Sequence, residues 1–360
     1  MLNDFTRIAA AAAVLLAGGL ALGTTHPPAA ATHRPPATAG KPGTASSASA
    51  DSFWSGPLIG SSASSTSLAQ ETSQFGTLPI VRVFYPALPG ANAWSTGLAG
   101  ANNSAVIVSF NADPAAIISG SDNAALAQFF DTAPTGNPIY YSYNHEPETA
   151  IAAGLYTAAQ YRQAWTVVAS IADQARNPDL HATLILMAYD LNPAAHRNWR
   201  DYLAGANSIS TLGWDAYPAG SGDGGTKELT PPAQFMGPAV AASHSAGLPF
   251  GFSEFGTSLV TGRPAWLTSV GSYLMTSGAL FGTLFDSSGP QPPMALTDPA
   301  SISAWRDVVT ASCNASGISD GLGSTGDSPV PIPEFSQLVD RAAVLIRGGG
   351  CGSWCPPPAG

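Results

Sequence analysis

Pro138-Ile-Tyr-Tyr-Ser-Tyr-Asn-His-Glu-Pro-Glu148 is the stretch from which the fold of this chain can be worked out. Its first half is β-branched and aromatic, which is typical of a short buried strand. Pro147 cannot continue a strand ladder, so Glu146 is expected at the carboxyl end of that strand. Residues 248–256 repeat the layout, with an apolar run followed by Glu254 and a glycine. The sequence therefore predicts two glutamates at strand ends.

Eight short apolar runs alternate with segments of helical spacing through residues 52–312. The runs are residues 58–61, 79–85, 104–110, 138–143, 182–188, 209–214, 249–253 and 279–285. The clearest helical spacing is at residues 157–172, and other helices are expected at 121–132, 232–246, 264–277 and 299–312. Strand and helix alternating eight times predict an α/β fold, a (β/α)8 TIM barrel. A doubly wound open sheet is the alternative, but no glycine-rich phosphate loop follows the first run.

Active sites of (β/α)8 barrels gather at the carboxyl ends of the strands. Glu146 and Glu254, which follow the fourth and seventh runs, would then share one mouth. Cleavage of a glycosidic bond needs such a pair, one carboxyl to protonate the leaving oxygen and one to attack or stabilise the sugar. A single strand-end glutamate is more often a solvated loop residue. Two of them in one barrel pattern favour a catalytic pair.

The two ends of the chain read differently from the core. Arg7 precedes an apolar run and small residues end at Ala31, so residues 1–31 are predicted to be a signal peptide. The run is shorter than the ~20 residues of a membrane span, although an uncleaved anchor is the alternative. Residues 32–51 are rich in Pro, Ala, Ser and Thr and are expected to form a disordered linker. Residues 313–360 are expected to add one helix, at 334–347, and a Cys, Gly and Pro-rich end.

Composition narrows the partners and cofactors. The net charge is −10 with 10% charged residues, and an acidic chain without a basic cluster is a poor partner for nucleic acid or anionic membranes. In an exported protein, Cys313, Cys351 and Cys355 suggest a disulfide, and their pairing stays open. No His pair stands at metal spacing, so we expect no metal and no other cofactor.

The polar residues at the strand ends resemble those of the clan A retaining glycoside hydrolases. The motifs are Asn144-His145-Glu146 after the fourth run, Asp215-Ala-Tyr217 after the sixth and Ser253-Glu254-Phe-Gly256 after the seventh. His145-Glu146 and the downstream helix that contains Tyr161-Arg-Gln-Ala-Trp165 are similar to glycoside hydrolase family 26, the β-mannanase family, over residues 53–312. The resemblance implies a secreted, extracellular enzyme that hydrolyses β-glycosidic bonds of a polysaccharide, mannan type favoured, with retention.

The same resemblance assigns roles to the central residues. Glu146 would be the general acid/base, and its pKa is expected to rise because of Glu254 and a partly dry cleft. Glu254 would be the nucleophile, held by a hydrogen bond from Tyr217. Arg82 lies in an otherwise apolar run and, if buried, must be paired with a carboxylate.

Further residues are candidates for contact with the sugar. They are Asn144, His145, Trp214 and Asp215 from the motifs, and Tyr85 and Phe285 at strand ends; Tyr85, Trp94, Trp214 and Phe285 are candidate stacking platforms. A non-catalytic glycan-binding barrel at the cell envelope, spaced by the linker, is the alternative function. Metal-assisted hydrolysis lacks clustered ligands. A monomer acting on a polysaccharide is expected.

Overall fold

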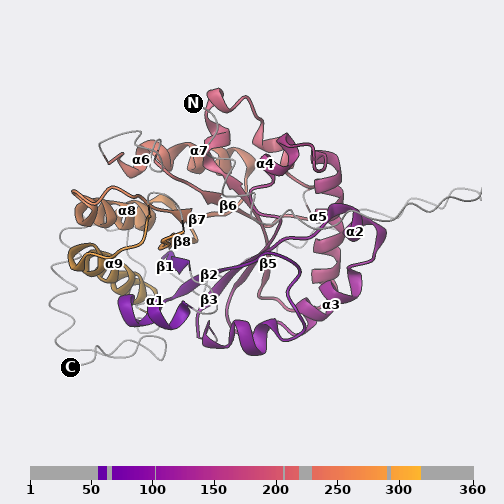
Figure 1. The fold of residues 1–360 in the computed structure, drawn as a ribbon, viewed down its shortest axis with the longest axis horizontal. Helices are drawn as coiled ribbons and strands as arrows, with labels where there is room; N and C mark the ends of the chain where they lie inside the picture. The colour runs from indigo at the N-terminus through magenta and orange to yellow at the C-terminus, as the bar shows by residue number, and fades with distance from the viewer. Residues whose placement is uncertain are drawn as a thin grey trace, which may run out of the picture. The chain divides into compact units, whose positions relative to one another are not determined.

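The computed structural model describes residues 56–317, except 63–66, 102, 206, 219–228 and 290–292. Within this part, eight parallel strands form a closed barrel in the order β1 to β8, and β8 pairs with β1 (Figure 1). The predicted (β/α)8 barrel is therefore confirmed. The predicted signal peptide, linker and 334–347 helix lie outside the described residues, as do Cys351 and Cys355.

Each of the eight predicted strands is present. They are β1 (Leu58–Ser62), β2 (Ile80–Tyr85), β3 (Ala105–Phe110), β4 (Ile139–Tyr143), β5 (Leu180–Met187), β6 (Thr211–Asp215), β7 (Phe250–Phe255) and β8 (Phe281–Leu284). Helices cover their outer face and side chains fill the barrel, so the strands are buried on both faces. That is why they read as apolar runs rather than as alternating patterns.

The five predicted helical segments are present, one of them split, and α1, α2 and α4 are helices that were not predicted. They are α1 (Leu68–Phe75), α2 (Pro114–Ser119), α3 (Asn123–Asp131), α4 (Pro147–Ala152), α5 (Ala158–Gln174), α6 (Pro232–Phe235), α7 (Gly237–Ala246), α8 (Arg263–Ser277) and α9 (Pro299–Gly317). The helix predicted at 232–246 is divided into α6 and α7. The reason is Pro238, which has no N–H to donate to the turn before it.

Helix α5 shows how the sequence fixes an element beside the fourth strand. Thr157 and Gln160 form a capping box at its start, which satisfies two N–H groups that the helix leaves open. Its buried face includes Tyr161, whose ring stacks on Tyr143 of β4 with centroids 5.6 Å apart. The Tyr161 hydroxyl donates to the carbonyls of Tyr143 and Asn144, at 3.3 and 3.2 Å. Helix α5 therefore holds the carboxyl end of β4.

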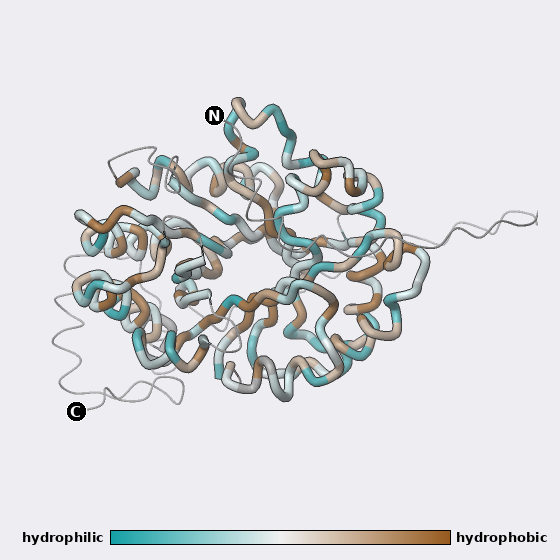
Figure 2. Tube along the Cα trace, in the orientation of Figure 1, coloured by the Kyte–Doolittle hydropathy of each residue, from teal (hydrophilic) through white to brown (hydrophobic). Residues whose placement is uncertain are grey.

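Two apolar layers support the barrel. The inner one fills the amino-terminal half of the barrel and consists of Leu58, Ile80, Ala105, Ile107, Tyr140, Ile185 and Phe281. The larger one lies between strands and helices, and brown, apolar stretches follow both kinds of element in Figure 2. The inner layer forms a floor beneath the carboxyl ends of the strands.

No helix in the described part of the chain is both long enough and apolar enough to cross a membrane.

Candidate active site

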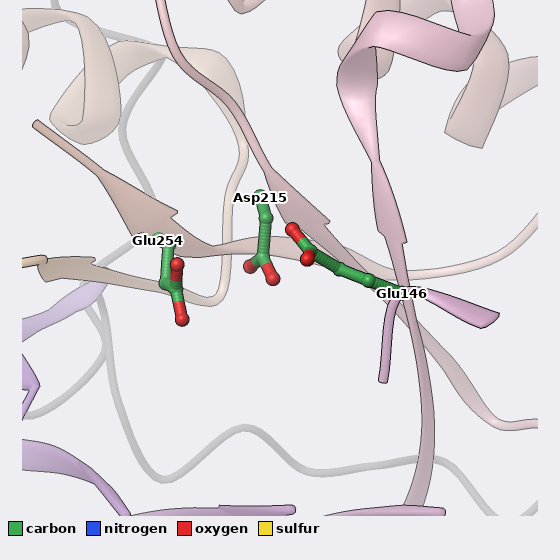
Figure 3. A group of neighbouring side chains, drawn as sticks. All are labelled: Glu146, Asp215 and Glu254. Atoms are coloured by element: carbon green, nitrogen blue, oxygen red, sulfur yellow. The ribbon is translucent and has the colours of Figure 1, made fainter. Parts of the chain in front are cut away.

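Three carboxylates converge at the carboxyl ends of β4, β6 and β7. An oxygen of Glu146, one of Asp215 and one of Glu254 all lie within 4.8 Å of one another. Figure 3 shows Asp215 between the two glutamates, with the side chains pointing toward one another. The barrel thus brings together two glutamates that are 108 positions apart in the sequence, as the strand-end pattern predicts.

A register shift between β6 and β7 aims Glu254 into the mouth. Trp214 pairs with Phe252, but the next pair is Asp215 with Glu254, so Ser253 is skipped. The Ser253 side chain already lies inside the barrel, beside Gly213. Strict alternation would turn the following side chain outward, whereas an irregularity of this kind re-aims it. Both carboxylates therefore face the same space.

Residues 144–146 form a turn after β4 in which two residues have left-handed backbone conformations. This turn, called the elbow below, orients the Glu146 side chain. Asn144 and Glu146 have φ values of 42° and 50°, which are uncommon for residues with a side chain. Hydrogen bonds to the neighbouring strands hold them, from Asn144 N to Phe110 O at 2.8 Å and from Glu146 N to Ile185 O at 3.0 Å. Backbone strain of this kind persists where the surroundings over-determine it, which is common at functional sites.

Arg82 supplies the positive charge of the site. Its guanidinium contacts both oxygens of Asp215, at 2.6 and 3.2 Å, and lies 3.2 Å from Glu254 Oε1. The side chain is fully buried and its guanidinium carbon lies 4.6 Å from the centre of the Phe84 ring. The sequence-based expectation that this arginine is paired is met by two partners rather than one.

Tyr217 and Phe285 border Glu254. The Tyr217 hydroxyl donates to Glu254 Oε2 at 2.6 Å, the contact expected from the sequence. The Phe285 ring meets Tyr217 edge to face, with centroids 6.3 Å apart. One oxygen of Glu254 therefore faces a cation and the other a hydroxyl donor, and both favour the ionised carboxylate.

The three carboxyls differ in whether the guanidinium of Arg82, which lowers a carboxyl pKa, is in contact with them. Burial, together with the charge of Glu254, raises the pKa of Glu146 to about 7. Burial also raises the pKa values of Asp215 and Glu254 to about 7; the charge of Arg82 works against the rise at all three carboxyls, and its guanidinium contacts Asp215 and Glu254 directly. Since the guanidinium contacts Asp215 and Glu254 and not Glu146, it favours the ionised form of the first two most strongly, and Glu146 is the carboxyl favoured to hold a proton. That arrangement leaves one acid and one ionised carboxylate facing the same space.

His145 and Asn144 lie beside the acid but face different neighbours. His145 packs against Phe84 with ring centroids 5.4 Å apart, and burial together with Arg82 lowers its pKa to about 3, so the ring is neutral. The Asn144 amide accepts from Ala112 N at 2.8 Å and donates to Ala112 O at 2.9 Å. That amide braces the β3 loop, and contact of either residue with a sugar stays a prediction.

The aromatic residues expected as sugar platforms fall into two groups. Trp214 is fully buried, and its indole N–H donates to Ser243 Oγ of α7 at 2.9 Å. The indole N–H of Trp94 donates to Phe129 O at 2.8 Å, and the Trp94 ring stacks on the Phe129 ring. The expectation of platforms at these two residues is wrong, because both rings face the outer helices. Tyr85 and Phe285 are half-buried at strand ends on the mouth side.

Two buried acids beside Glu146 were not predicted as part of the site. Glu148 is fully buried, and Asp190, on the 3-10 turn Ala188–Leu191 after β5, is 3% exposed. Glu148 closes the stretch from which the fold was worked out, but no role was predicted for it. Asp190 carried the same signal as Glu146, a carboxylate just after an apolar strand, and this signal would have identified it.

The carboxylate trio is the one group in the described residues with spacing suitable for a metal ion. The guanidinium of Arg82 contacts two of its three members. The positive charge that a cation would bring is therefore already supplied by a side chain.

Comparison with protein-family models gives no match, and comparison with curated protein sequences gives none. Among solved structures, this chain is similar to the catalytic domain of a GH26 endo-β-1,4-mannanase from Bacillus sp. JAMB-750, with TM-score 0.52 and 13% identity over 71% of this chain and 86% of that one. It is also similar to a GH26-CBM35 β-(1,4)-mannanase from Podospora anserina, with TM-score 0.48 and 14% identity over 71% of this chain, which spans 61% of that one. A GH26 β-mannanase from Bacteroides ovatus gives TM-score 0.47 and 11% identity, over 71% of this chain and 88% of that one.

The fold and the site define a closed (β/α)8 barrel with a carboxylate trio, of which Asp215 and Glu254 are buried and Glu146 half-buried, and an arginine at its mouth. The GH26 mannanase catalytic domain from Bacillus sp. JAMB-750 shares this fold, so the resemblance read from the sequence extends to the fold. At these identities the likeness concerns the fold alone.

Proposed function

We propose that this protein is a secreted glycoside hydrolase that cleaves β-glycosidic bonds with retention of configuration. The observation that carries the proposal is the carboxyl pair, with oxygens of Glu146 and Glu254 within 4.8 Å of one another. Retaining enzymes hold their two carboxyls ~5–5.5 Å apart, whereas inverting enzymes need roughly 6.5–9.5 Å to admit a water. The short separation favours retention.

The reaction follows from the protonation states. Glu146 donates its proton to the glycosidic oxygen while a Glu254 oxygen attacks the anomeric carbon, so the carbon–oxygen bond to the leaving sugar breaks as a glycosyl ester forms. Glu146, now ionised, takes a proton from water. The water oxygen bonds to the anomeric carbon, the ester bond breaks, and both carboxyls return to their starting states.

The remaining site residues support this cycle electrostatically. Arg82 and Tyr217 stabilise Glu254 as a carboxylate before attack and again as it leaves in the second step. Asp215 fixes the guanidinium through two contacts. Asp215 is therefore assigned to positioning, which refines the sequence-based view of a sugar contact.

The substrate class is proposed as a β-linked polysaccharide, with mannan favoured. The fold likeness to the Bacillus endo-β-1,4-mannanase supports that choice. Export is proposed from the signal-peptide pattern at residues 1–31. A polymer substrate suits a site at the open mouth of a barrel.

The test is release of reducing sugars from β-mannan, glucomannan, xylan and β-glucan by the purified chain. We expect Glu146→Gln and Glu254→Gln to lower turnover by ~10²-fold or more, because each removes one half of the acid and nucleophile pair. The matched control is Asp131→Asn, an exposed carboxylate on α3, which is expected to keep wild-type activity.

Azide supplies a second readout. In Glu254→Ala, azide is expected to take the nucleophile's place and to give a product of inverted configuration, detectable by NMR. Wild-type turnover in both glutamate variants would contradict the proposal. Glycan binding that survives in both variants, with no turnover in the wild type, would point to a non-catalytic binding barrel instead.

A further inference from the structure

The elbow that carries Glu146 is joined to β5 by two hydrogen bonds of different kinds. Glu146 N donates to Ile185 O at 3.0 Å, as in a parallel ladder. The second bond runs from Met187 N to Glu148 Oε1 at 2.9 Å. A side chain from the first turn of α4 thus completes a pair of ladder bonds.

The position of the Glu148 side chain explains the left-handed backbone conformation of Glu146. In a parallel ladder, the residue whose N–H donates to the carbonyl of Ile185 would accept from Met187 N through its own carbonyl. Here Glu148 Oε1 occupies that acceptor place. The carbonyl of Glu146 is thereby released from the ladder, and the residue adopts φ 50° and ψ 56°.

The surroundings of the other oxygen of Glu148, Oε2, indicate whether this carboxyl is ionised or protonated. Glu148 Oε2 is buried and makes no hydrogen bond within the described residues, and the same holds for Asp190 Oδ2. The cation of this region, Arg197, contacts Asp190 Oδ1 at 3.1 Å. A buried carboxylate without a cation of its own is costly, whereas a protonated Glu148 has an Oε2–H to donate to a polar neighbour or a water.

The groups that face Glu148 agree with a neutral carboxyl. They are Glu146 on the elbow, Asp190 with Arg197 behind it, and the hydroxyls of Tyr156, Tyr161 and Tyr202. Burial comes first in raising the pKa of Glu148 well above its ordinary value, and Asp190 and Glu146 raise it further. Arg197 forms an ion pair with Asp190, so Asp190 is the ionised carboxyl of the two and Glu148 is the protonated one.

We propose that Glu148 is a positioning residue that acts as a neutral carboxyl, replacing the Glu146 carbonyl in the β4–β5 ladder so that the acid/base can turn toward Asp215 and Glu254. This inference rests on the proposed function. Glu148 touches no reacting atom, and it acts through the backbone of Glu146. The assignment predicts that the shape of the side chain matters and that its charge does not.

The test compares Glu148→Gln with Glu148→Leu on the active polysaccharide and on a 2,4-dinitrophenyl β-glycoside of the same sugar. Glutamine keeps the acceptor for Met187 N and is neutral, so kcat/KM within ~2-fold of wild type and an unchanged pH profile are expected. Leucine removes the acceptor, and a misplaced acid is expected to lower kcat/KM on the polysaccharide by ~10²-fold. The dinitrophenyl leaving group needs no proton, so its kcat/KM is expected to fall less than ~10-fold.

Two outcomes would overturn the proposal. A basic limb that moves to lower pH in Glu148→Gln would mean that an ionised Glu148 had been raising the pKa of Glu146. Full polysaccharide turnover in Glu148→Leu would mean that the ladder bond does not position the acid.

Two further measurements need no turnover, so they separate this proposal from the proposed function. The infrared band of a protonated carboxyl in wild type at neutral pH is expected to lose intensity in Glu148→Gln, and an unchanged band would refute the neutral assignment. In a crystal structure of Glu148→Leu, Glu146 is expected to leave positive φ. If the leucine variant does not fold, the infrared measurement on the glutamine variant still decides the charge state.

Discussion

At the scale of single residues, the charge count of the site explains its protonation. One guanidinium faces two buried carboxyls and the half-buried Glu146, and its contacts reach Asp215 and Glu254. Ionising Glu146 as well would bury a third negative charge opposite a single cation, which is strongly unfavourable. The site therefore holds an acid and a carboxylate side by side near neutral pH, as the proposed reaction requires.

Tyr217→Phe tests how Glu254 is kept ionised. The hydroxyl donates to Glu254 Oε2 and lowers the pKa of that carboxyl, so its removal raises the pKa. Because turnover needs ionised Glu254, the acidic limb of kcat/KM against pH is expected to move to higher pH, with kcat lower by ~10–10²-fold. Tyr273→Phe, a half-buried tyrosine on α8, is the matched control. An acidic limb that stays in place would show that the hydroxyl does not control this carboxyl.

At the scale of elements, α9 fastens the two ends of the barrel. Ser312 is fully buried on α9, where its hydroxyl donates to Pro57 O at 2.6 Å and accepts from Ile59 N at 3.1 Å. One side chain near the end of the described chain thus satisfies one backbone group in the first strand and one just before it. Since β1 also pairs with β8, this contact supports closure of the barrel.

Ser312→Ala is expected to destabilise the fold by about 1–3 kcal/mol, because it leaves a buried N–H and a buried carbonyl without their hydroxyl partner. Urea unfolding followed by circular dichroism measures the loss. Ser303→Ala removes an exposed hydroxyl from the same helix and is expected to stay within about 0.5 kcal/mol of wild type. Equal stability of the two variants would mean that the Ser312 bonds contribute nothing net.

At the scale of the whole molecule, buried acids make stability depend on pH. Glu71 of α1 is 3% exposed, and burial, with Asp286 adding to it, raises its pKa from 4.5 to about 8. Between those two pH values the folded chain binds more protons than the unfolded chain, so the free energy of unfolding falls as pH rises. Glu146, with a pKa of about 7, acts in the same direction.

We therefore expect the free energy of unfolding to decrease from pH 5 to pH 8, and to decrease less in Glu71→Gln. Glutamine is neutral at every pH and still accepts the hydrogen bond that Ser61 Oγ donates to Glu71 at 2.7 Å. Urea titrations at several pH values measure the slope, with Asp131→Asn as the control. An identical slope in wild type and Glu71→Gln would contradict the assignment.

Local sequence signals predicted the barrel and the central pair. Apolar runs mark strands buried on two faces, and Pro147, which has no ladder donor, limited how far the fourth strand could extend. Because Arg82 stands within an apolar run, the sequence predicted that its charge is paired with a carboxylate, without saying which one. These inferences depend on bond geometry and burial, which the order of residues along one segment specifies.

Only the tertiary structure decided which way the side chains face and what they meet. The skipped Ser253 turns Glu254 inward, and Trp214, one residue before Asp215, packs under α7 instead of at the mouth. Glu148 meets Met187 N only because β5 lies beside the elbow. A register shift and a contact between strands depend on how separate segments pack together, so a single segment of sequence carries no record of them.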